Sequence, residues 1–121
     1  MAEGSGNPTI APGRLEPEES EVVMEVKRRL VEMLGDRMIR FVLYGSRARG
    51  DSDRRSDIDI AIIVRGLTTD LKNRVLDAVA DVEMEFLIPL STFVVSEEQF
   101  EYLRQRERRI ALDIEKEGIP L

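Results

Sequence analysis

The chain has 121 residues, which is the length of one domain. It contains no cysteine and no histidine, so disulfides and thiol nucleophiles are excluded and any metal must bind to oxygen ligands. The net charge of −6 at pH 7 gives no strong signal for nucleic-acid binding. No apolar run reaches the ~20 residues that a membrane span needs, and the amino terminus does not read as a signal peptide. We therefore expect a soluble, cytoplasmic protein.

The first part of the chain divides into a leader and a helix. Residues 1–17 contain three of the five prolines and show no periodic apolar pattern, so they predict a flexible leader. Residues 18–121 are expected to form a single domain. Its first helix is predicted from about Pro17 to Leu34, because apolar residues recur there at helical spacing and Gly35 follows as a terminator.

The remaining elements alternate between strand and helix. They are a strand at Met38 to Tyr44, a strand at Asp57 to Val64, a helix from Thr68 or Thr69 to about Glu85, a third strand within Phe86 to Val95, and one or two helices up to Glu117. Pro89 cannot donate a ladder hydrogen bond, so the third strand is expected at a sheet edge or at a bulge. The pattern predicts an α/β or α+β fold with a small sheet flanked by helices.

The most informative segment joins the first two strands. Gly45 and Ser46 follow the first strand, and Asp57 and Asp59 open the second. Side chains alternate along a strand, so both carboxylates share one face about 7 Å apart and can bind one or two shared divalent cations. Gly45 has no Cβ to keep a phosphate away, and Ser46 offers a hydroxyl and an amide. The segment therefore predicts a nucleoside triphosphate at the turn, a metal at the carboxylates, and nucleotidyl transfer.

Basic residues follow the Gly-Ser turn, and the residues from Asp51 onward exclude two other binding motifs. Arg47 and Arg49 are candidates for phosphate contact, and Arg54 and Arg55 also offset the repulsion between the two carboxylates. A P-loop reading fails because Asp51 stands where that motif needs its lysine. A calcium loop that begins at Asp51 fails because the required later ligands are missing. An aspartate pair alone is most often a surface turn, and the ordered string of elements makes the functional interpretation more specific.

At these residues the chain resembles the minimal nucleotidyltransferases (MNT proteins) of the DNA polymerase β-like superfamily. Gly45-Ser46 with Asp57-x-Asp59 matches the family signature Gly-Ser-x10-Asp-x-Asp. The resemblance is strong over about residues 41–64 and weaker over 93–121. It implies a small mixed sheet flanked by helices, Mg²⁺ or Mn²⁺ as the cofactor, and transfer of a nucleoside monophosphate, AMP when ATP is the substrate. Several MNT proteins are encoded beside a HEPN-domain protein and act as its antitoxin, by binding it and by adding AMP to it.

The family normally has a third carboxylate on the strand after the aspartate pair. Glu85 has the expected context, because Met84 and Phe86 flank it, whereas counting back from Ser91 places Pro89 at that position. Pro89 can neither bind a metal nor act as a base.

The question of whether Glu85 supplies the third carboxylate leaves two main hypotheses. With Glu85 in that role, we expect an enzyme that transfers AMP to a hydroxyl of a partner protein, because the chain is too short for its own substrate-recognition domain. Without it, we expect a catalytically silent module that neutralises a HEPN-type partner by binding. A third interpretation is a transferase for a small molecule such as an antibiotic. The sequence leaves a monomer, a homodimer and a hetero-complex open.

Overall fold

The computed structural model describes residue 11 and residues 13–50 and 56–121. The elements are α1 (Pro17–Leu34), a short 3₁₀ turn (Gly35–Arg37), β1 (Met38–Tyr44), α2 (Gly45–Arg49), β2 (Asp59–Val64), α3 (Thr69–Phe86), β3 (Ser91–Ser96), α4 (Glu97–Gln105), α5 (Arg109–Glu117) and β4 (Ile119–Pro120). The predicted α/β class is confirmed. The second strand begins at Asp59, so Asp57 lies just before it.

The strands form one mixed sheet in the order β3-β2-β1-β4. Strand β1 pairs antiparallel with both β2 and β4, and β2 pairs parallel with β3. Strand β3 therefore lies at an edge of the sheet, as the proline before it predicts. The parallel pair is connected by α3, which crosses from the end of β2 to the start of β3.

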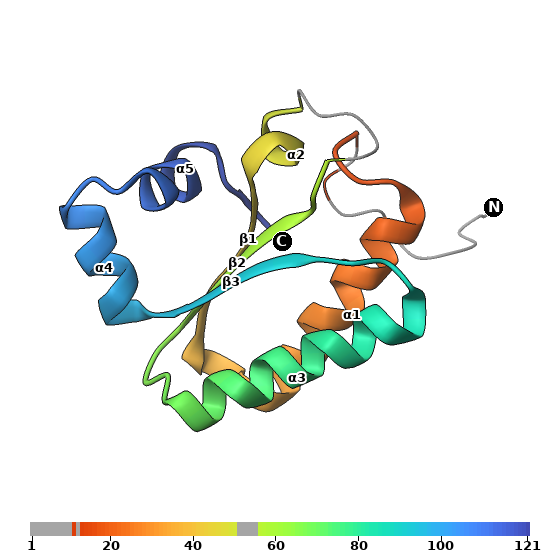
Figure 1. Ribbon diagram of the computed structural model, residues 1–121, viewed down its shortest axis with the longest axis horizontal. Helices are drawn as coiled ribbons and strands as arrows, with labels where there is room; N and C mark the ends of the chain where they lie inside the picture. The colour runs from red at the N-terminus through yellow and green to blue at the C-terminus, as the bar shows by residue number, and fades with distance from the viewer. Residues whose placement is uncertain (1–10, 12, 51–55) are drawn as a thin grey trace.

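The helices cover the two faces of the sheet unequally. Figure 1 shows α1 and α3 side by side on one face, α4 and α5 on the other, and α2 at the end of β1. We call these two faces the closed face and the open face. The core of the closed face is the larger, and it combines residues of α1 and α3 with every second residue of the neighbouring strands. The core of the open face is smaller and includes Phe100 of α4 and Ala111 and Ile114 of α5.

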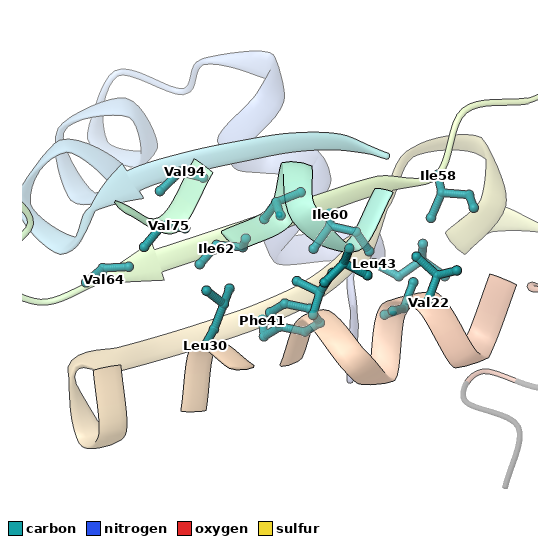
Figure 2. Close-up of a cluster of buried hydrophobic side chains, with 14 of the residues drawn as sticks. Val22, Leu30, Phe41, Leu43, Ile58, Ile60, Ile62, Val64, Val75 and Val94 are labelled. Atoms are coloured by element: carbon teal, nitrogen blue, oxygen red, sulfur yellow. The ribbon is translucent and has the colours of Figure 1, made fainter. Parts of the chain in front are cut away.

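Strand β2 shows how the sequence divides between these faces. The apolar residues that point to the closed face are Ile58, Ile60, Ile62 and Val64, and all are buried there (Figure 2). Ala61 and Ile63 point to the open face. Because side chains alternate along a strand, Asp59 belongs to the same open face, at the beginning of the strand.

The predicted leader is described only in part. Residues 1–10 and 12 lie outside the described residues. Of the remainder, Leu15 is buried in the closed-face core and Arg14 hydrogen-bonds to the backbone of α2. In the described part of the chain, no helix is long and apolar enough to cross a membrane.

Candidate functional site

The junction between β1 and α2 brings the Gly-Ser turn against the second strand. Gly45 begins α2 with a φ of +77°, a conformation that favours glycine. An added Cβ at this position would lie 2.5 Å from Oδ2 of Asp59. A glycine therefore both permits the turn and leaves room for the Asp59 carboxylate. The two halves of the predicted motif are in direct proximity.

Asp59 is the more buried member of the aspartate pair. It pairs with Tyr44 in the antiparallel register, while Asp57 is exposed just before the strand. Burial raises the pKa of Asp59, the negative charge of Asp57 raises it further, and a hydrogen bond with Ser91 and the positive charge of Arg49 act in the opposite direction. A carboxylate whose ionisation is disfavoured by burial and by a second nearby carboxylate, beside a turn without a Cβ, fits a hard divalent cation that binds oxygen. Asp57 and Asp59 are the residues that would hold it.

Two neighbours of Asp59 were not found by sequence reasoning. Ser91 lies opposite Asp59 in the parallel register, and its hydroxyl hydrogen-bonds the Asp59 carboxylate. Tyr44 is partly buried on the other side, and burial together with the charges of Asp59 and Asp113 raises its pKa. Only the strand register reveals Ser91, because nothing in its local sequence marks it as a site residue.

The two predicted phosphate-binding arginines differ in their environment. The Arg47 residue is only 4% exposed, and its guanidinium donates to both carboxylate oxygens of Glu19 at 2.7 and 2.8 Å. Arg49 is exposed, donates to Glu117 at 3.2 Å, and is close enough to Asp59 to lower its pKa. The structure therefore associates Arg49 with the aspartates, whereas the Arg47 guanidinium is engaged with α1.

Glu85 is not brought to the aspartates. It lies on α3, which covers the closed face, and its carboxylate accepts hydrogen bonds from Nη2 of Arg29 at 2.9 and 3.0 Å. The parallel register begins with Asp59 opposite Ser91, and Pro89 lies two residues before this paired segment. Within residues 11, 13–50 and 56–121, no group of three or more acidic side chains gathers into a metal-binding cluster. Asp51, Arg54 and Arg55 lie outside the described residues.

The fold and the junction of turn and aspartates define an α/β domain of the nucleotidyltransferase type. Residues 23–118 match the family described as "Nucleotidyltransferase domain". Because this match covers most of the chain, the protein belongs to that family. The predicted membership of the polymerase β-like superfamily is thereby confirmed, while the MNT subgroup stays a prediction.

Two individual proteins resemble the chain. A segment of 49 residues, 40% of the chain, is 41% identical to a Methanocaldococcus jannaschii protein described as "putative protein adenylyltransferase", and it spans 50% of that protein. A crystal structure described as a "putative nucleotidyltransferase" from Sulfolobus solfataricus superposes with a TM-score of 0.55 at 18% identity, covering 97% of this chain and 90% of the other. The second similarity shows the fold alone.

Proposed function

We propose that this nucleotidyltransferase transfers AMP from ATP to a hydroxyl of a partner protein, with Mg²⁺ or Mn²⁺ bound by Asp57 and Asp59. The observation that carries the proposal is the Asp59 carboxylate, which lies against the Gly45 turn and has its pKa raised by burial and by Asp57. The relative described as "putative protein adenylyltransferase" supports AMP as the transferred group and a protein as the acceptor.

The residues of the open face would divide the work of binding. The backbone of Gly45 and the amide and hydroxyl of Ser46 would bind the phosphates, and the exposed Arg49 would contact them from the end of α2. When bound, the cation neutralises negative charge on the phosphate oxygens. The acceptor oxygen would attack the α-phosphorus, the bond to the β-phosphate would break, pyrophosphate would leave, and the hydroxyl proton would be released.

A HEPN-domain protein is the partner that we propose, as the MNT resemblance implies, and this chain would then serve as its antitoxin. The same partner suits a second candidate function, in which the chain is catalytically silent and neutralises the partner by binding. The observation that favours this second function is that neither candidate supplies a third carboxylate: Ser91 of β3 stands opposite Asp59, and Glu85 of α3 is engaged with Arg29.

A labelling experiment separates the two functions. The protein and its partner from the neighbouring gene, or a host lysate, are incubated with Mg²⁺ and ATP that carries the label on the α-phosphate. A parallel sample uses label on the γ-phosphate, which leaves with pyrophosphate and cannot mark a nucleotidylated protein. We expect a labelled band with the α-label alone, and its mass identifies the acceptor.

The decisive variant is Asp57→Asn combined with Asp59→Asn. It should lose labelling by about 100-fold or more, because the cation ligands are gone. The matched control, Asp77→Asn combined with Asp81→Asn, removes the same charge from exposed positions of α3 and should label normally. Undiminished labelling by the first variant would contradict the assignment. No labelling by the wild type, with the partner still bound, would favour the silent module.

A further inference from the structure

The start of α1 contacts α2 through a buried ion pair. We define the α1 start segment as residues 14–19. The side chain of Arg47 is 5% exposed and that of Glu19 is 15% exposed, and the two form two parallel hydrogen bonds. Arg47 also donates to the carbonyl oxygen of Arg14 at 3.2 Å. This bidentate geometry fixes the orientation of the two side chains as well as the distance between them, which a single hydrogen bond does not.

A second set of contacts runs in the opposite direction. Nε of Arg14 donates to the carbonyl oxygen of Ala48 at 3.1 Å. Gly50, which ends α2 with a φ of +77°, lies so close that an added Cβ would be 3.2 Å from Cζ of Arg14. The α1 start segment therefore binds α2 in two ways. Arg47 of α2 donates to the segment, and Arg14 of the segment donates to the backbone of α2.

Glu19 is itself held in place. Its Oε1 accepts a hydrogen bond from the amide of Glu16 at 2.8 Å, as part of the cap at the beginning of α1. The hydrogen bonds from Arg47 are the main cause of a lowered Glu19 pKa, so the carboxylate is ionised at neutral pH. The capped end of α1 thus presents a fixed negative charge to α2.

The position of α2 matters because this helix begins with Gly45 and Ser46. A shift of α2 would move Gly45 relative to the Asp59 carboxylate, which it already approaches closely. On its other side α2 is held to α5 by a more exposed ion pair between Arg49 and Glu117 at 3.2 Å. The buried pair to Glu19 is the better shielded of the two ties.

We propose that Glu19 and Arg47 are positioning residues that hold the Gly45-Ser46 turn at the correct distance from Asp59 for triphosphate binding. The inference rests on the proposed function. Glu19 precedes the residues that match the family, 23–118, so one half of this ion pair lies outside the matched segment. It also gives Arg47 a role different from the phosphate contact that its sequence position suggests.

The test measures the affinity for an α,β-methylene analogue of ATP with Mg²⁺ by titration calorimetry. The variants are Glu19→Gln, Arg47→Gln and the double variant. Glu19→Gln keeps one oxygen for the Glu16 amide, removes the charge, and replaces the other acceptor oxygen of the bidentate pair with an NH2 group. We expect each single variant to bind the analogue about tenfold more weakly than the wild type. The double variant should bind it no more weakly than either single variant, because the two substitutions break the same ion pair.

The matched control is Arg29→Gln, which breaks the ion pair between α1 and α3 on the closed face and should leave the affinity unchanged. If Arg47 bound phosphate directly, Glu19→Gln would free its guanidinium and leave binding equal or tighter, and that result would overturn the proposal. Equal weakening by the control would overturn it too. Circular dichroism confirms folding, and Glu19→Gln alone decides if Arg47→Gln unfolds. A wild type that does not bind the analogue would instead refute the proposed function.

Discussion

The closed and open faces of the sheet differ in the side chains that strand β2 contributes to each. On the closed face, three alternating apolar residues of β2 and Ile58 just before the strand are at most 3% exposed and pack under two long helices. On the open face, β2 contributes two apolar residues and Asp59, and the shorter helices α4 and α5 pack there. One alternation of side chains therefore builds both the main core and the candidate site.

The difference indicates that stability and chemistry are separated across the sheet. The closed face is packed mainly by apolar side chains. The open face contains a charged group whose ionisation opposes folding, namely an aspartate whose pKa is raised by burial and by a neighbouring charge, beside a glycine at a φ of +77°. A charged group of this kind persists only when the rest of the fold holds it in place.

The largest effect is expected for Gly45→Ala, which disturbs the turn beside Asp59. The positive φ alone costs about 1–3 kcal/mol of unfolding free energy, and the new Cβ must displace the Asp59 carboxylate. We expect nucleotidyl transfer to fall by about 100-fold. Urea denaturation measures the first effect and the α-label assay the second.

The matched control for this prediction is Gly35→Ala. Gly35 also has a positive φ, +57°, but nothing lies within 4 Å of its added Cβ. The control should lose a similar amount of stability and keep its transfer activity. If both variants keep activity, contact between the turn and Asp59 is not required for the reaction.

A smaller effect is expected for Asp59→Asn on the pH dependence of stability. The pKa of Asp59 is raised in the folded state from its ordinary 3.8, so between these two values the folded protein binds more protons than the unfolded one. Stability contributed by this residue is therefore present at low pH and is lost as the pH rises through the raised pKa. The variant removes this loss, so its urea midpoint should fall less between pH 4 and pH 7.

Asp77→Asn serves as the control, because it removes an equal charge from an exposed position of α3. Its pH profile should run parallel to that of the wild type. A loss of stability in Asp59→Asn at pH 7 would contradict the view that the ionised carboxylate is held at a cost in the absence of a cation.

Local patterns in the sequence were sufficient for the helices and the first three strands, but not for β4. Apolar periodicity placed α1 and the alternation along β2, and the Gly-Ser and aspartate spacing identified two segments that the fold brings together. The partners of charged groups were not predictable, because they depend on tertiary packing. Glu19 and Arg47 are 28 residues apart, and neither has a local signal that names the other.

The register of β3 is a second feature that the sequence left open. Counting back along the chain suggested Pro89 near the aspartates, but only the parallel pairing shows that Ser91 lies opposite Asp59. The three consecutive apolar residues in the middle of β3, residues 93–95, show no strict alternation, so they give no local signal for its register. Residues contributed by a neighbouring strand therefore had to come from the structure.

The smallest effect is expected for Glu85→Gln, which tests whether a residue of the closed face takes part in the reaction. Glu85 is half exposed and binds Arg29, which also donates to Glu25 at 2.7 Å. Loss of this surface pair should cost less than about 1 kcal/mol of unfolding free energy, as measured by urea denaturation, and should leave transfer to the partner unchanged. If Glu85→Gln instead abolishes labelling while the protein stays folded, the carboxylate takes part in the reaction. The closed face would then contribute to the chemistry, and the separation between the two faces would fail.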